Sequence, residues 1–299
     1  MSSYRLFGAM AVTMAVLFAL LSLVYLAALW FFGVNAESAL VYMIPFVLFF
    51  TGLQWYIGPW LIKFMTRMRD CNDSGVLAMV SAEAQNAGVP TPKVYIVENH
   101  TPNAFAFGRT QKSSSIALHT GLLNLLDKDE LRGVIAHEVG HIKHRDVIIM
   151  TLASVLPTLL FYIFYFGGMM AGGRDRNNGG IGFWLGAYFG GLIAQFIGSL
   201  LVLYLSRVRE YHADEHSARA TRNPDALGSA LAKISYGLSR SKPVPGNAML
   251  NSFYILDQAT SLHDVEGRMA EEEKHGFVEI FMSHPLTAKR IKALRQFRP

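Results

Sequence analysis

Long apolar segments alternate with polar ones along this chain. Four apolar runs, each of 24 to 26 residues, contain no Asp, Glu, Lys, Arg or His. These runs occupy residues 7–32, 39–62, 147–172 and 181–205. A helix of about 20 apolar residues can cross the roughly 30 Å hydrocarbon core of a bilayer, so the pattern predicts four transmembrane helices arranged as two hairpins.

The first run lies near the N-terminus, where a cleavable signal peptide would stand. Its 26 apolar residues far exceed the roughly 7–15 residues of a signal-peptide core. We therefore expect this run to be a retained membrane anchor.

The polar segment between the hairpins predicts a small unit of mixed helix and strand. Three stretches rich in β-branched and aromatic residues predict neighbouring strands of a compact antiparallel sheet. These strands are expected at residues 93–97, 103–107 and 115–119. Asp127 and Glu130 have the spacing of a helix capping box, which predicts that a helix begins there.

The predicted fold class is an α+β integral membrane protein with four transmembrane helices and a mainly helical polar domain that holds a small antiparallel sheet. The second hairpin is expected to interrupt that polar domain. The predicted parts are an N-terminal transmembrane hairpin at 1–65, a first part of the polar domain at 66–146, the second hairpin at 147–205 and the second part of the polar domain at 206–299.

Composition supports a membrane protein and limits the chemistry of the chain. Hydrophobic residues make up 52% and charged residues 16%, which is unusual for a soluble globular protein. The single cysteine, Cys71, excludes an intrachain disulfide framework and a cysteine-rich zinc site, and it agrees with a reducing compartment.

Basic residues beside the apolar runs predict the orientation of the chain. Eight of them lie on one side and two on the other. The first side carries Arg5, Lys63, Arg67, Arg69, Lys143, Arg145, Arg207 and Arg209, and the second carries Arg174 and Arg176. Cytoplasmic loops are the ones enriched in Lys and Arg, so both termini and the polar domain are expected in the cytoplasm. Because the net charge of +5 follows this pattern rather than a basic cluster, we expect no nucleic-acid partner.

The predicted helix after Asp127 contains the sequence H-E-x-x-H. Residues four apart on a helix lie on one face, about 6 Å from each other, so His137 and His141 can reach one metal ion. Glu138 lies beside them and can hold a water molecule, as in zinc-dependent hydrolysis. Catalytic zinc takes three protein ligands. A metzincin would supply a histidine six residues after the second one, but position 147 is Val, which excludes that class.

Glu210 is the candidate for a third ligand, as in gluzincins. It follows the fourth apolar run, whereas His141 precedes the third. An antiparallel hairpin therefore brings the two together at the membrane surface. Asp214 lies one turn after Glu210 and can accept the second ring N–H of His137 or His141.

Four ordered motifs resemble those of the HtpX family of membrane-bound zinc endopeptidases, which are related to the CAAX prenyl proteases. The motifs are Asn103–Ala106, His137–His141, Ser206–Asp214 and His284–Ile291. The resemblance covers nearly the whole chain. The prenyl-protease branch is built from seven spans, so the four runs here favour HtpX.

The resemblance implies one Zn²⁺ per chain in a gluzincin-type catalytic domain. It implies that His137, His141 and Glu210 are the zinc ligands and that Glu138 is the general base. His284 is a candidate donor to the oxyanion, where a loop or cap residue before Pro285 is the other reading. The resemblance also favours substrate binding by an edge strand at Asn103, Ala104 and Phe105, where an ordinary strand end is the other reading.

The resemblance further implies quality control under stress. The expected substrates are misfolded or damaged membrane proteins and unfolded polypeptides, and the expected place is the cytoplasmic face of a prokaryotic plasma (inner) membrane. Residues 239–276 are the expected position of a mobile lid.

Three other functions are compatible with parts of this sequence. A CAAX-type protease for lipidated C-termini would need an intramembrane chamber, which four spans are too few to enclose in a monomer. A zinc transporter would place its ligands within the membrane, but the four runs contain none. A non-catalytic zinc-binding scaffold has no need of Glu138, which this chain retains.

Overall fold

The computed structural model describes residues 39–172, 181–236, 272 and 276–297. Several sequence predictions lie outside these residues: the first apolar run, Arg174 and Arg176, and most of the expected lid. The chain forms two compact units, 1–54 with 161–192 and 55–160 with 193–299.

The apolar runs form long helices. In the part of the chain that the structure describes, the runs lie in α2 (Ala39–Thr66), in α6 (Asp146–Ala153) followed by α7 (Leu156–Gly172), and in α8 (Ile181–Thr221). Among the described residues, three helical segments are long and apolar enough to cross a membrane: Pro45–Thr66, Asp146–Gly168 and Leu185–Thr221. They correspond to the second, third and fourth predicted spans.

Helices α7 and α8 pack through aromatic rings and glycines in the first unit. The ring of Phe161 lies 5.7 Å from the rings of both Tyr165 and Tyr188. A Cβ atom at Gly191 would lie 2.8 Å from the Phe161 ring, so only glycine fits there. Small residues let apolar helices approach closely in this way.

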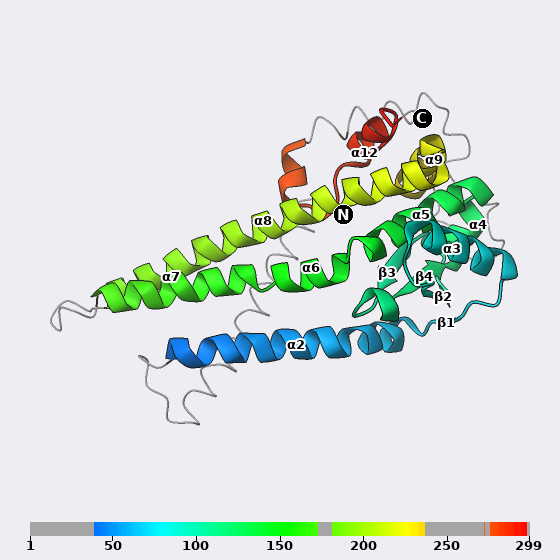
Figure 1. The fold of residues 1–299 in the computed structure, drawn as a ribbon. Coiled ribbons are helices and arrows are strands. Elements are labelled where there is room, and N and C mark those ends of the chain that lie inside the picture. Colours follow the sequence, from blue (N-terminus) through cyan, green and yellow to red (C-terminus); the bar gives the residue numbers. More distant parts are fainter. Residues whose placement is uncertain (1–38, 173–180, 237–271, 273–275, 298–299) are drawn as a thin grey trace, which may run out of the picture. The chain divides into compact units, whose positions relative to one another are not determined.

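The second unit is built on a four-stranded sheet (Figure 1). Its strands are β1 (Arg69–Asp70), β2 (Lys93–Val97), β3 (Ala104–Phe107) and β4 (Ser115–His119), in the order β1-β2-β4-β3. Strands β2 and β4 are parallel, whereas β1 pairs with β2 and β3 pairs with β4 in antiparallel fashion. The sheet is therefore mixed, and the prediction of an antiparallel sheet was wrong.

The burial of the strands explains this order. Every residue of β4 is buried, whereas β3 is mostly half-buried. The chain runs from β3 through the short helix η1 (Gln111–Ser113) back into β4, so that the fully buried strand takes a central position. Strand β3 is left at an edge of the sheet.

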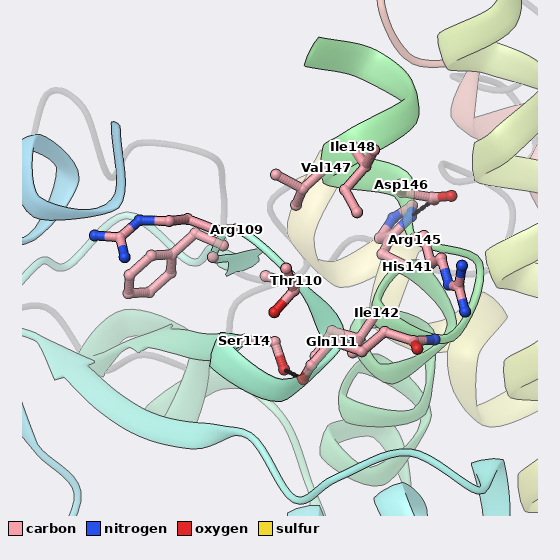
Figure 2. Close-up of a pocket in the computed structure, with 13 residues that line it drawn as sticks. Arg109, Thr110, Gln111, Ser114, His141, Ile142, Arg145, Asp146, Val147 and Ile148 are labelled. Carbon is pink, nitrogen blue, oxygen red and sulfur yellow. Dashed lines mark hydrogen bonds and ion pairs between the residues drawn. The ribbon is translucent and has the colours of Figure 1, made fainter. Parts of the chain in front are cut away.

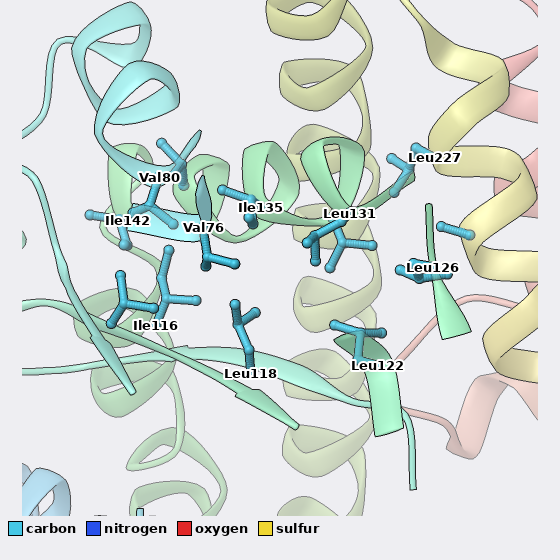
Figure 3. Close-up of a cluster of buried hydrophobic side chains, with 14 of the residues drawn as sticks. Val76, Val80, Ile116, Leu118, Leu122, Leu126, Leu131, Ile135, Ile142 and Leu227 are labelled. Atoms are coloured by element: carbon cyan, nitrogen blue, oxygen red, sulfur yellow. The ribbon is translucent and has the colours of Figure 1, made fainter. Parts of the chain in front are cut away.

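Helices cover one face of the sheet and form the core. Helices α3 (Ser74–Ala87), α4 (Thr120–Leu125) and α5 (Lys128–Lys143) surround it. Figure 3 shows Ile116 and Leu118 of β4 facing Ile135 of α5, with Val80 beside them, and all four side chains are completely buried. This packing fixes which side of α5 faces the sheet.

The capping box at the start of α5 is confirmed. The Asp127 carboxylate accepts the amides of Asp129 and Glu130, and the Glu130 carboxylate accepts the amide of Asp127. Helix α9 (Pro224–Tyr236) packs on α5 and on α12 (Thr287–Leu294). The remaining described element is η2 (Gly276–Phe281).

Candidate active site

Helix α5 presents both histidines of the H-E-x-x-H sequence to α8. Because Ile135 and Val139 are fully buried in the core, the opposite side of the helix carries His137 and His141. Their Nε2 atoms lie 3.2 Å apart. His137 and Glu138 are almost entirely buried.

Helix α8 places Glu210 against these two imidazoles. The Glu210 oxygens lie 3.7 Å from Nε2 of His137 and 3.5 Å from Nε2 of His141. Ligand atoms around a tetrahedral zinc, with bonds of about 2.0–2.1 Å, are roughly 3.3–3.4 Å apart. These three residues form a cluster that can hold a metal ion, and two imidazole nitrogens with a carboxylate are a donor set that suits zinc.

A close contact between α5 and α8 makes this geometry possible. A Cβ atom at Gly140 would lie 3.2 Å from both Cα of Ala213 and Cβ of His216. The buried hydroxyl of Ser217 donates to the carbonyl of Gly133 at 2.7 Å. Gly140 therefore lets α8 lie near enough to bring Glu210 to the histidines.

Asp214 and Arg290 lie behind His137. Asp214 Oδ1 is 2.9 Å from Nδ1 of His137, and the Arg290 guanidinium donates to both Asp214 oxygens at 2.8 and 2.6 Å. Arg290 Nη1 also lies 3.0 Å from Glu210. Burial alone would lower the pKa of Arg290, but the charges of Asp214 and Glu210 raise it, so this guanidinium stays positive between two buried carboxylates.

Asp146 and Arg209 form the matching arrangement behind His141. Asp146 Oδ2 lies 2.5 Å from Nδ1 of His141, and Arg209 holds that carboxylate at 2.6 Å. Burial lowers the pKa of His141, but the hydrogen bond to Asp146 and the charges of Glu138 and Glu210 outweigh it and raise that pKa. A carboxylate behind each ring nitrogen orients the other nitrogen toward the metal position.

The position of Asp146 depends on a turn that the sequence pattern did not predict. Helix α5 ends at Lys143, and Arg145 adopts a left-handed conformation with φ of 57°. This conformation is uncommon for a residue with a side chain. It turns the chain so that Asp146, the first residue of α6, points back to His141. Asp146 and Arg290 were not predicted as site residues, and Arg209 was predicted only as a basic residue beside an apolar run. Arg209 and Arg290 nevertheless lie inside two of the four motifs.

Glu138 is held by the edge strand. Its Oε2 accepts the backbone amide of Ala106 at 2.8 Å. The carbonyl of Asn103 accepts the amide of His119, so Asn103 faces β4. Backbone groups alternate in direction along a strand of an antiparallel pair, and those of Ala104 and Ala106 therefore face the open edge.

The side chains of the predicted substrate-binding residues lie in different surroundings. Asn103 is exposed, and Ala104 packs on the main core. The ring of Phe105 lies 5.8 Å from Phe107 and 6.1 Å from His119, on the far face of the sheet. The open edge thus offers backbone groups rather than these side chains.

His284 reaches the cluster from the loop before α12. Its Nδ1 lies 3.2 Å from Glu210 Oε1, and its side chain is 63% exposed. His284 is therefore close enough to the ligand cluster to act there, and the exposed side of its ring faces solvent.

A small pocket lies next to the cluster, between the end of β3 and the junction of α5 with α6. Figure 2 shows His141 and Asp146 on one side of it and Thr110, Gln111 and Ser114 on the other. Its cavity volume is about 20 Å³, enough to hold a water molecule.

Comparison with known proteins identifies peptidases as the relatives of this chain. Residues 71–298 match peptidase family M48. The chain is 40% identical over 223 residues to "Protease HtpX homolog" of Thermococcus sibiricus, covering 73% of this chain and 72% of that one. It is 32% identical over 286 residues to "Protease HtpX homolog" of Bifidobacterium longum, covering 94% and 89%.

A solved structure shares the fold. The crystal structure of S. mikatae Ste24p matches with a TM-score of 0.62 at 19% identity and covers 95% of this chain. The chain spans 64% of the length of that protein.

Proposed function

Since the chain belongs to peptidase family M48 and is a membrane metalloprotease, we propose that it is a zinc endopeptidase that cuts misfolded or damaged membrane proteins at the cytoplasmic face of a prokaryotic plasma membrane. The observation that carries this proposal is the buried cluster of His137, His141 and Glu210 with Glu138 beside it.

His137, His141 and Glu210 would hold the zinc, which when bound would polarise the scissile carbonyl and make the attacking water more acidic. Glu138 would act as the general base, taking a proton from the attacking water and passing it to the leaving amine. The Ala106 amide donates to Oε2 of Glu138, which leaves Oε1 available to exchange that proton.

The positions of Asp214 and Asp146 support roles as orienting residues in this reaction. Each carboxylate fixes the tautomer of one histidine, so that Nε2 carries the free lone pair. We assign to His284 the stabilisation of the oxyanion by hydrogen bonding, because it reaches Glu210 from the exposed side of the site.

The open edge of β3 is the proposed substrate site. Extended peptides add to exposed edges through backbone hydrogen bonds, and the backbone groups of Ala104 face outward here. Such binding would read backbone rather than side chains, which suits a protease for unfolded segments. The pocket beside His141 would then admit only a small substrate side chain next to the scissile bond.

The proposed cytoplasmic face rests on the distribution of basic residues. Lys63, Lys143, Arg207 and Arg209 border the apolar runs at the ends that join them to the polar segments 66–146 and 206–299. A catalytic domain formed by residues 66–146 and 206–299 would then act on loops that emerge from the bilayer.

Metal analysis with casein cleavage tests this function. We expect detergent-purified wild type to contain about one zinc per chain and to cleave casein, as catalytic zinc sites do. Glu138→Gln should retain zinc and lose at least about 100-fold in turnover, because general-base catalysis contributes roughly 10²–10⁴. Glu210→Ala should lose zinc and activity.

Glu215→Ala is the matched control, since Glu215 lies on the same helix and pairs only with Arg219 among the described ion pairs. It should keep zinc and activity. Wild-type turnover in Glu138→Gln, or full zinc in Glu210→Ala, would refute the corresponding role.

Cleavage of a prenylated C-terminal peptide, measured beside that of an unfolded membrane protein, separates the proposal from a CAAX-type protease. Preference for the prenylated peptide would support the latter.

A further inference from the structure

Helix η2 is a short apolar segment whose large side chains are mostly exposed. Phe277 is 74% exposed, and Val278, Ile280 and Met282 are 37–38% exposed. Its single charged residue, Glu279, turns toward α12, where its carboxylate accepts the amide of Leu286 and pairs with Lys289. The outward surface of η2 is therefore entirely apolar.

This surface continues the apolar surface of α8. The Phe281 ring lies 6.4 Å from the ring of Phe196, which belongs to the membrane-spanning segment of α8. In the same part of α8, large side chains are exposed as expected for a surface that faces lipid. They are Ile193, Phe196, Ile197, Leu201 and Tyr204.

Arg207 satisfies the carbonyl groups at the end of η2. Its Nη1 donates to the carbonyls of Glu279, Ile280 and Met282 at 2.8–3.1 Å. Helix ends exposed to water need no such partner, whereas backbone carbonyls in lipid must be satisfied within the protein. The capping of three carbonyls by one guanidinium fits a segment that lies among lipids.

We propose that η2 is an interfacial segment whose apolar side chains, led by Phe277, insert into the lipid bilayer next to α8. The occupant of this surface is lipid, because the surface continues a membrane-spanning helix and carries no outward charge. Elements that lie in the membrane interface bury an apolar face with Trp, Phe or Leu side chains at the boundary between headgroups and acyl chains.

The position of η2 in the chain connects the membrane contact to the active site. Only Ser283 separates Met282 from His284, whose imidazole lies 3.2 Å from Glu210. Insertion of η2 would hold His284 at the bilayer surface, where the loops of membrane-protein substrates emerge. This consequence rests on the proposed function, whereas the membrane contact itself does not.

Depth-dependent fluorescence quenching tests the contact. The chain has one cysteine, the buried Cys71, so a Cys71→Ser background allows single labels on the full-length protein. Phe277→Cys and Val278→Cys carry an NBD fluorophore in vesicles of phosphatidylcholine and phosphatidylglycerol. Leu77→Cys, on the exposed side of α3, is the matched control, and Leu201→Cys marks the lipid-facing part of α8.

We expect lipids that carry a spin label near the headgroup to quench both η2 labels several-fold more than the Leu77 label, and aqueous iodide to quench them less. Leu201 should respond most to a deep spin label. Two results would overturn the proposal. If iodide quenched both η2 labels as strongly as the Leu77 label, η2 would lie in water. If neither the lipid spin label nor iodide quenched the η2 labels, protein would cover them.

Proteolysis then tests the consequence. Phe277→Ser should cleave soluble casein at the wild-type rate but lose several-fold in cleavage of a membrane-anchored substrate, and Leu77→Ser should cleave both normally. If Phe277→Ser cleaved the membrane-anchored substrate at the wild-type rate, the link between membrane contact and activity would be refuted. If the wild type itself cleaved neither substrate, the proposed function would fail, and the quenching result would still hold.

Discussion

Arg290 is the residue on which two buried carboxylates of the site depend. Its guanidinium contacts Asp214 and Glu210, and all three side chains are at most 9% exposed. Removing one partner from a buried ion pair costs about 3–5 kcal/mol, because the remaining charge is left without a counterion.

Arg290→Met should therefore lower the thermal stability of the protein and its affinity for zinc together. Thermal denaturation in detergent and zinc titration measure the two effects. Arg295→Met, at the exposed end of the same helix, should change stability by no more than about 0.5 kcal/mol. Unchanged stability and zinc affinity in Arg290→Met would contradict the role of Arg290.

Asp146 should control the pH dependence of metal binding. The proton on His141 competes with zinc, and Asp146 helps raise the pKa of His141. As the pH falls, the zinc affinity of the wild type should therefore begin to decrease at a higher pH than it would if His141 had the pKa of an ordinary histidine. Asp146→Asn should move this decrease to lower pH and reduce affinity at neutral pH by about 10–100-fold.

Zinc titrations across a pH series measure both effects. An unshifted pH profile in Asp146→Asn would exclude Asp146 as the cause of the raised pKa.

At the residue scale, the sequence predicts the position of a site residue correctly where that position depends only on local helical spacing. The four-residue period of a helix places His137 and His141 together without any tertiary information. Asp146 is different, because a left-handed Arg145 brings it back to His141. No periodic pattern predicts that conformation, and Arg290 reaches the site only through the packing of α12.

At the scale of elements, the spacing of α5 and α8 decides whether Glu210 reaches the histidines. Gly140→Ala gains helix propensity of about 1 kcal/mol, but its Cβ would crowd Ala213 and His216. We expect the crowding to dominate and to shift α8, so that zinc affinity and casein cleavage decrease.

Gly228→Ala is the matched control on α9. Its Cβ would meet only Ile291 at 4.0 Å, an ordinary contact, so this variant should raise stability by about 0.5–1 kcal/mol and leave zinc binding intact. Equal behaviour of the two variants in thermal denaturation and zinc titration would argue against a special role for Gly140.

The strands show what a pattern can and cannot predict about an element. The predicted positions of β2 and β4 match the structure, and β3 begins one residue later than predicted. The order in the sheet was not predictable from local sequence, because it depends on which strand becomes buried on both faces. The two-residue strand β1 is too short to carry a pattern.

At the scale of the whole molecule, the number of spans remains a prediction that the termini can test. Four spans place both termini on one side of the membrane, whereas the three described apolar segments alone would place them on opposite sides. Fusions of a reporter active only in the cytoplasm should therefore be active at both the N-terminus and the C-terminus.

The same fusions with a reporter active only outside the cytoplasm should be inactive at both ends. Activity at one end alone would refute a span at residues 7–32, and external activity at both ends would reverse the proposed orientation.

The bond from the Ala106 amide to Glu138 has a consequence for how this site tolerates sequence change. The donor is a main-chain group, so it is present whichever amino acid occupies position 106, with proline as the exception. The alignment of the proposed base is thus inherited with the strand and not with a particular side chain. On the proposed function, substitutions along this edge would change which peptides bind and leave Glu138 aligned with the backbone beside it.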